Sequence, residues 1–380
     1  MRKSGLLGAG AVLLVLLGCG PSADDPCSPV CGRGFECYFG VCVPASEADT
    51  SDGGDDGTVE IADDGSDDAA DDGTPPAAGK LDLLFVIDNS SSMGTKQADL
   101  MANFPALVDA LFDPAIGAVT DLNVGVISTD MGVGGFTVPT CSGNDDGVLL
   151  HDPRPGVPGC APSYDSFLHA GTADHGSAFA SSFACIATLG TNGCGFEQPF
   201  AAAGKALTVH SRSGGANAGF LRSDSALGVI ILSDENDCSA SDASLFDPMG
   251  PDELRLRCVN HASELTPVGA TADMLRGLRP GGRLAVGLLV GVPPSVGICN
   301  NTGDVISPCL SEPTMHEEVE PATGSVRLVC GATAAEGATP GVRHVQLASD
   351  LGARAVVRSI CDPRYDTFFE QFARMARSAP

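Results

Sequence analysis

Basic residues are scarce in this sequence. Lysine and arginine make up 21 of the 380 residues, against 48 aspartates and glutamates, and the net charge is −27. This balance argues against nucleic-acid binding, because contacts with phosphate rely on lysine and arginine. Cys-x-x-Cys pairs are absent, which weakens zinc-ribbon and thioredoxin-like interpretations. No apolar run reaches about 18 residues, so we expect no membrane-spanning helix.

Motifs of common hydrolases and nucleotide-binding enzymes are also missing. No serine lies in a Gly-x-Ser-x-Gly turn, and Gly204-Lys205 is followed by alanine and lacks the upstream glycine of a P-loop. His316-Glu317 begins like the helix of a zinc protease, but no histidine follows four residues on. We therefore expect that the protein is not an enzyme.

The amino terminus and the cysteines predict export. Fifteen cysteines are typical of an oxidising compartment. Arg2 and Lys3 precede an apolar run over 6–17, as in an export signal that is too short to span a bilayer. The run ends in Leu-Leu-Gly-Cys19, which resembles a bacterial lipobox and implies lipidation of that cysteine. Gly20, rather than Asp, follows this cysteine, and by resemblance to known lipoprotein sorting this implies the outer membrane or cell surface. The alternative is an ordinary signal peptide with an incidental cysteine.

Two small segments follow the expected signal peptide at 1–19. With Cys19 set aside, an even number of cysteines remains, and four of them fall in residues 20–44. This segment is too short for a hydrophobic core, so we expect two disulfides of undetermined connectivity to hold it together. Residues 45–79 are rich in Asp and Gly and lack Lys and Arg, which predicts an extended acidic linker. The linker does not fit an EF-hand, because its Asp-Gly steps lack an oxygen ligand at the third loop position.

From Lys80 onward the pattern is globular. Short apolar runs predict buried strands, and apolar residues at helical spacing predict helices. The expected strands are 81–87, 122–128, 228–233, 284–290 and 355–359, and the expected helices are 96–112, 177–189, 197–211 and 365–377. Their alternation predicts one α/β domain over 80–380, with a doubly wound, mostly parallel sheet flanked by helices.

A Gly-, Pro- and Asp-rich insertion at about 132–175 interrupts this pattern. A loop of this length is unusual and is often functional or held covalently. We expect a Cys141–Cys160 disulfide within it and a Cys185–Cys194 clamp around the following turn. By proximity in the sequence, the other expected pairs are Cys238–Cys258, Cys299–Cys309 and Cys330–Cys361.

The most informative stretch is Leu81–Gly94, with the sequence LDLLFVIDNSSSMG. Its apolar strand ends at Asp88, and the hydroxyls of Ser90 and Ser92 follow before a helix. In an open α/β sheet, ligands bind at loops that leave the carboxyl ends of strands. One carboxylate and two hydroxyls on a single turn suit Mg²⁺ or Mn²⁺. The alternative is that Asp88 or Ser90 only caps the helix.

This stretch is followed by a threonine in a Gly-rich turn and by an apolar strand that ends in an aspartate. The whole pattern, from about Lys80 to the C-terminus, resembles the von Willebrand factor type A (vWA) domain. The resemblance implies a metal-ion-dependent adhesion site formed by Asp88, Ser90, Ser92, Thr191 and Asp234. Thr188 is the alternative candidate for the threonine of the second loop. The family usually has glycine after the last aspartate, where this chain has Glu235.

Two further acidic residues lie near these loops. Asp130 follows the second strand, and we interpret it as a turn residue rather than an additional acid of the site. Asp237 either supports the site or caps local structure beside Cys238.

These features predict a lipid-anchored protein of the bacterial envelope. Through Mg²⁺, or alternatively Mn²⁺ or Ca²⁺, its vWA domain is expected to bind a protein or peptide with an exposed carboxylate. The alternative function is a structural or assembly lipoprotein with a vestigial metal site, whose disulfide-bound loops make the contacts.

Overall fold

The computed structural model describes residues 35–38, 41–44, 79–116, 119–139, 141, 143–154, 157–333 and 335–378. Of the cysteine-rich segment, it describes an antiparallel pair of strands, β1 (Phe35–Tyr38) and β2 (Val41–Pro44). The expected signal peptide, the lipidation of Cys19, the disulfides of residues 20–44 and nearly all of the linker lie outside the described residues.

A six-stranded sheet forms the centre of the domain, in the order β10-β7-β6-β3-β4-β5. Five strands are parallel, and β5 (Leu168–Gly171) pairs with β4 in the antiparallel direction at one edge. The parallel strands are β3 (Lys80–Ile87), β4 (Asp121–Ser128), β6 (Ala226–Leu232), β7 (Leu284–Val290) and β10 (Ala355–Ser359). The expected α/β class with a mostly parallel sheet is confirmed.

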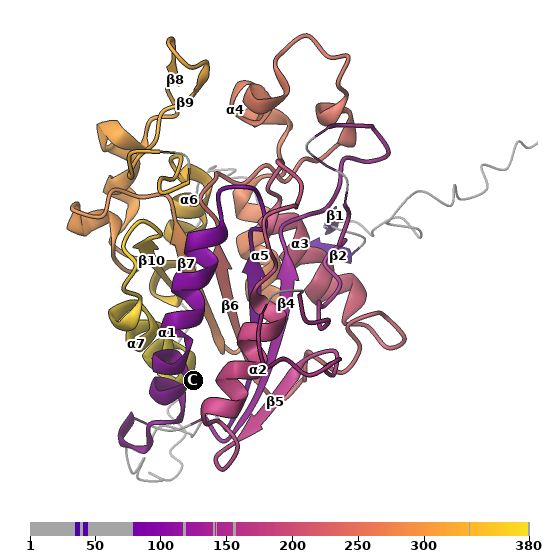
Figure 1. Cartoon of the computed structure of the whole chain (residues 1–380), viewed down its shortest axis with the longest axis vertical. Helices are drawn as coiled ribbons and strands as arrows, with labels where there is room; N and C mark the ends of the chain where they lie inside the picture. Colours follow the sequence, from indigo (N-terminus) through magenta and orange to yellow (C-terminus); the bar gives the residue numbers. More distant parts are fainter. Residues whose placement is uncertain are drawn as a thin grey trace, which may run out of the picture.

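Helices cover both faces of this sheet, which is why its strands are apolar runs rather than alternating patterns (Figure 1). One face carries α1 (Gly94–Phe112), α2 (Ser177–Ala187) and α7 (Asp366–Ser378), and the other carries α3 (Pro199–Lys205), α5 (Val268–Leu278) and α6 (Val342–Leu351). The expected 197–211 helix is interrupted, because α3 continues as a π-helical turn, Ala206–His210.

Aromatic rings fill the core between the sheet and the first of these faces. Phe104 of α1 stacks on Phe183 of α2 with ring centroids 3.7 Å apart. Phe368 and Phe372 of α7 are fully buried, as their spacing on one helix face predicts. Gly287 of β7 makes room for them, because a Cβ atom there would lie 2.7 Å from the Phe368 ring.

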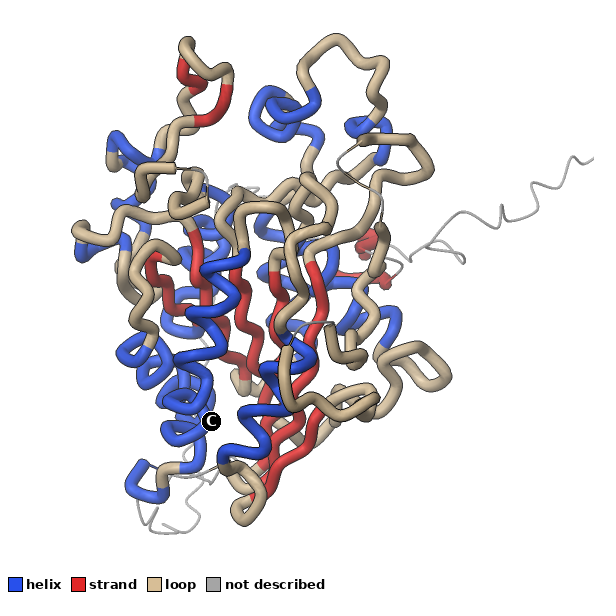
Figure 2. The backbone as a smooth tube through the Cα atoms, in the orientation of Figure 1, coloured by secondary structure: helices blue, strands red, loops and turns tan. Residues whose placement is uncertain are grey.

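Long loops gather at the carboxyl ends of the parallel strands (Figure 2). They contain the short elements α4 (Arg257–Asn260), β8 (Val319–Glu320) and β9 (Ser325–Val326). Three of the loop segments, 133–141, 194–196 and 238–265, share a small hydrophobic cluster of their own, which we call the rim. Its buried members include Val138, Phe196, Leu245, Phe246 and Leu265.

Five disulfides lie within the described residues, as expected for an oxidising compartment. Cys238–Cys258, Cys299–Cys309 and Cys330–Cys361 are confirmed. The predictions of Cys141–Cys160 and Cys185–Cys194 are wrong, because the structure pairs Cys141 with Cys194 and Cys160 with Cys185. Both bonds therefore tie the insertion to other segments instead of closing it on itself. No helix in the described part of the chain combines the length and apolarity needed to cross a bilayer.

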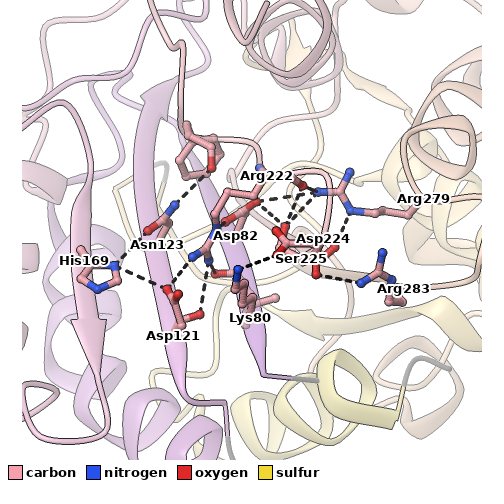
Figure 3. A network of polar contacts seen from close by, with 12 residues as sticks. Lys80, Asp82, Asp121, Asn123, His169, Arg222, Asp224, Ser225, Arg279 and Arg283 are labelled. Carbon is pink, nitrogen blue, oxygen red and sulfur yellow. Dashed lines mark hydrogen bonds and ion pairs between the residues drawn. The ribbon is translucent and has the colours of Figure 1, made fainter. Parts of the chain in front are cut away.

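Ion pairs lie at the other end of the sheet, where β3 and β4 begin (Figure 3). The Arg222 guanidinium lies 2.7 Å from Asp82 Oδ1 and 2.5 Å from Asp121 Oδ1. Asp82 is fully buried and also accepts a hydrogen bond from the Ser225 hydroxyl. Burial raises the pKa of Asp82, so its ionised form depends on these partners.

Candidate metal centre

Two of the three expected loops meet where the winding of the sheet reverses. From the central strand β3 the chain proceeds to β4 on one side, and it later returns to β6 on the other side. The loops after β3 and β6 therefore leave adjacent carboxyl ends, where open α/β sheets bind ligands. The Ser90 and Ser92 hydroxyl oxygens lie 3.3 Å apart, and the Ser92 hydroxyl donates to Asp234 Oδ1 at 3.1 Å.

Asp88 lies beneath these groups and is fully buried. Its Oδ1 accepts the Ser90 amide at 2.8 Å, and its Oδ2 accepts the Ser233 hydroxyl at 2.7 Å. Burial, and then the negative charge of Asp234, raise the pKa of Asp88 to about 6. Because both oxygens already accept hydrogen bonds, Asp88 is suited to orienting the groups around a cation.

The second loop joins the first through its backbone. The Gly193 amide donates to the Asn89 carbonyl oxygen at 2.8 Å, and the Gln97 side chain bonds to the backbone of both Asp88 and Gly190. A side chain at Gly193 is excluded, because a Cβ atom would lie 2.0 Å from Asn89 Oδ1. These contacts fix the turn that carries the expected threonine against the DxSxS loop.

Thr191 and its rival Thr188 have different surroundings. Thr191 lines a cavity of about 790 Å³ together with Ser90 and Ser91. Thr188 instead donates its hydroxyl to the Ala184 carbonyl at 2.8 Å, at the end of α2. The geometry therefore favours Thr191 as the residue of the second loop.

Three charged residues of the centre were not predicted from the sequence. Lys96 of α1 is 2% exposed, and its ammonium lies 2.5 Å from Asp234 Oδ2. Glu197 precedes α3, is 1% exposed, and accepts the Thr129 hydroxyl on Oε2. Glu235 follows Asp234 directly and lines the same cavity as Ser90. A sequence pattern gave no sign of Lys96 or Glu197, since their partners lie far away along the chain.

The centre contains four carboxyl groups, those of Asp88, Glu197, Asp234 and Glu235, and one ammonium, that of Lys96. Burial, followed by the charges of Asp88 and Glu235, raises the pKa of Glu197 well above its usual value. Burial, followed by the charges of Asp88 and Asp234, raises the pKa of Glu235 to about 8. Among the described residues, Lys96 is the one ammonium that pairs with any of these four carboxyl groups, and it pairs with Asp234. A divalent cation would favour the ionised forms of these carboxyl groups.

Two buried oxygens of this region accept no hydrogen bond from the described residues, Glu197 Oε1 and Asn89 Oδ1, although the protonated Glu197 carboxyl can share its proton with Asp88. Buried polar atoms are rarely left without a partner unless a water or ion supplies one. Hydroxyl, amide and carboxyl oxygens are the donors that Mg²⁺ and Mn²⁺ prefer. On both grounds, the residues present fit a hard divalent cation.

Asp130 and Asp237 have structural roles. Asp130 accepts the Gly132 amide at 2.9 Å and the Cys194 amide at 3.2 Å, as a turn residue does. Asp130 also lies near Cys141 and Cys194, a set with metal-ligand spacing, but these two cysteines form a disulfide. Asp237 accepts the Phe200 amide at the start of α3 and pairs with Arg343 at 3.0 Å. It therefore caps local structure.

Comparisons with known proteins give little guidance. No family model matches the chain, and no curated protein matches it. Among solved structures, the pilus adhesin SpaC from Lactobacillus rhamnosus GG is similar over 43% of this chain and 16% of that chain, with 12% identity and a TM-score of 0.23. The similarity thus spans under a fifth of the adhesin.

Proposed function

We propose that residues 80–380 form a vWA-type domain that binds a carboxylate-bearing protein or peptide through a divalent cation. The observation that carries this proposal is the contact between the first and third loops, where the Ser92 hydroxyl meets Asp234 at 3.1 Å. Two loops separated by more than a hundred residues converge there at the point where strand order reverses.

The residues that would hold the cation have distinct tasks. Neutral hydroxyls are offered by Ser90, Ser92 and Thr191. Negative charge is contributed by the carboxylates of Asp88 and Asp234. A cation held mainly by neutral ligands keeps much of its charge and would attract a partner's carboxylate.

The cavity above Ser90 suits a peptide segment. Its volume of about 790 Å³ lies within the range of small-ligand sites, and the rim supplies apolar wall residues such as Val138, Phe196 and Leu254. Arg255 of the wall is paired with Glu253 at 2.6 Å, and Glu253 and Glu235 also line the cavity, so the attraction for an acidic side chain would come from the cation. An acidic side chain flanked by apolar residues matches this lining.

We further propose that the protein is exported and lipid-anchored through Cys19 at the bacterial outer membrane or cell surface. The five disulfides support an oxidising location. Retention of radiolabelled palmitate by the wild type, and its loss on Cys19→Ser, would test the anchor separately from the site.

The binding function is tested with two matched libraries of short peptides that differ only in a fixed central Asp or Asn. Immobilised full-length protein should retain the Asp library in MgCl₂ and release it in EDTA, because only a carboxylate gains the charge-assisted contact. Equal retention of both libraries, or retention of the Asp library in EDTA, would contradict the proposal.

The alternative is a structural or assembly lipoprotein with a vestigial site, and one observation favours it. The Lys96 ammonium already neutralises Asp234 from 2.5 Å inside the protein. If this internal ion pair replaced the metal, calorimetry would detect no Mg²⁺ binding, and partners would bind the rim equally well in EDTA.

Metal affinity should rise with pH. Glu235 has a pKa of about 8 and Asp88 one of about 6 without metal, so a cation must displace protons below these values. The Mg²⁺ association constant is expected to increase with pH up to about 8, more steeply below about pH 6, where both groups are protonated, than between about pH 6 and about pH 8. Titration calorimetry at several pH values measures this, and Glu235→Gln should remove the upper part of the rise. A flat profile in the wild type would contradict the prediction.

A further inference from the structure

The Lys96 side chain is held from three sides. Its ammonium donates to Asp234 Oδ2 at 2.5 Å, to the Ser92 carbonyl at 3.2 Å and to the Ala335 carbonyl at 3.1 Å. An ammonium has three N–H donors, and all three are used here. Since the side chain is also 3% exposed, the ammonium is a fixed internal group rather than a mobile surface charge.

This arrangement limits what Asp234 can offer to a metal. Its Oδ2 is bound by Lys96, and its Oδ1 faces the Ser92 hydroxyl at 3.1 Å. The oxygen of Asp234 that faces the serines is therefore Oδ1, and a cation bound by both oxygens would have to share Oδ2 with the Lys96 ammonium. The two oxygens of Asp88 are similarly engaged by Ser90 and Ser233.

The number of available oxygens matters because Mg²⁺ and Ca²⁺ differ in what they require. Mg²⁺ takes six ligands in a tight octahedron, retains water readily and is satisfied by single carboxylate oxygens. Ca²⁺ is larger, takes six to eight oxygens and often uses both oxygens of a carboxylate. A site that withholds the second oxygen of its carboxylates is thus better suited to the smaller ion.

We propose that Lys96 is a positioning residue that selects Mg²⁺ or Mn²⁺ over Ca²⁺ by holding Asp234 Oδ2 away from the metal. This inference rests on the proposed function, because it presupposes that a cation binds beside Ser90, Ser92 and Asp234. Lys96 has a second, separable effect: its positive charge lowers the affinity for every divalent cation alike. The ratio of the two affinities therefore reports the positioning role and is insensitive to the charge.

The test uses titration calorimetry of the full-length protein with MgCl₂ alone and with CaCl₂ alone. The wild type should bind Mg²⁺ at least as tightly as Ca²⁺. In Lys96→Met, which has a similar shape but no ammonium, both affinities should rise, and Ca²⁺ should gain about tenfold more than Mg²⁺ because Asp234 becomes free to bind with both oxygens.

The matched control is Lys205→Met. Lys205 also forms an ion pair with an aspartate, Asp146, at 2.6 Å, but it is one-third exposed and its partner is not a residue of the centre. Both affinities should stay within about twofold of the wild type, as the pair is screened by solvent. Circular dichroism shows whether each variant is folded.

The outcomes separate this inference from the proposed function. A wild type that binds neither ion overturns the proposed function itself. A wild type that binds both ions but prefers Ca²⁺ overturns the role of Lys96 alone, without any need for the variant. A folded Lys96→Met protein whose Mg²⁺ to Ca²⁺ ratio equals that of the wild type overturns it as well.

Discussion

Replacing Asp88 with alanine is expected to weaken Mg²⁺ binding by about 100-fold or more while leaving the protein folded. The loss follows because Asp88 organises two groups of the centre, the Ser90 amide and the Ser233 hydroxyl, through its two oxygens. The fold should survive because the raised pKa of Asp88 shows that burial opposes its charged form. Calorimetry measures the affinity, and thermal melting followed by circular dichroism measures the fold.

Two further variants make this result interpretable. Asp88→Asn keeps the shape of the side chain but removes the charge, so it should also lose most of the affinity. Asp109→Ala removes a carboxylate from an exposed position of α1 and should bind Mg²⁺ like the wild type. An Asp88→Ala protein that retains the wild-type affinity would show that the metal, if bound, lies elsewhere.

Replacing Arg222 with methionine should lower the free energy of unfolding by about 3 kcal/mol, because it removes the guanidinium closest to a buried carboxylate. Asp82 is fully buried, and Arg222 binds it through both the side chain and the backbone amide. The backbone amide of position 222 and the Ser225 hydroxyl still donate to Asp82 in this variant, and Arg279, 3.7 Å from Asp82, is too distant to replace the lost guanidinium contact. Urea denaturation with the disulfides intact measures the change.

The double variant Arg222→Met/Asp82→Asn should recover part of this stability, since the uncompensated charge is gone. As a surface control, Arg327→Met removes a pair with Glu318 in which both side chains are more than half exposed. Its effect should be within about 1 kcal/mol. If Arg222→Met were as mild as Arg327→Met, the network at the amino ends of the strands would not contribute to stability as inferred.

The sequence was sufficient to predict the centre of the sheet. Strands β3, β4, β6, β7 and β10 are apolar runs because both faces are covered, and such runs are visible without a structure. The edge strand β5 was missed, because its four residues are LHAG and His169 faces solvent. A short strand of this composition has no pattern that distinguishes it from the surrounding insertion.

The candidate site was predictable where its residues follow predicted strands. Asp88, Ser90, Ser92 and Asp234 could be named because each lies within a few residues of a strand end. Lys96 could not, since its role depends on a carboxylate 138 residues away. Glu197 depends similarly on Thr129.

Disulfide pairs, too, could be predicted only where the two cysteines are joined by a short stretch of sequence or lie at neighbouring strand ends. Three pairs within one loop region or neighbouring strand ends were predicted correctly from proximity in the sequence. Cys141 and Cys160 instead bond to Cys194 and Cys185, because the folded insertion brings its two parts against different segments. Sequence distance is a poor guide once a loop packs on other elements.

The rim has a practical consequence for protein engineering. Its residues pack on one another, and the Cys141–Cys194 and Cys238–Cys258 bonds link its segments covalently. The stretch between Cys238 and Cys258 is closed by a disulfide, and its exposed residues can be varied while the buried Leu245 and Phe246 are kept. Libraries that vary these exposed residues would present different binding surfaces beside an unchanged candidate metal centre. The Cys238–Cys258 disulfide would hold the two ends of the stretch together in every member.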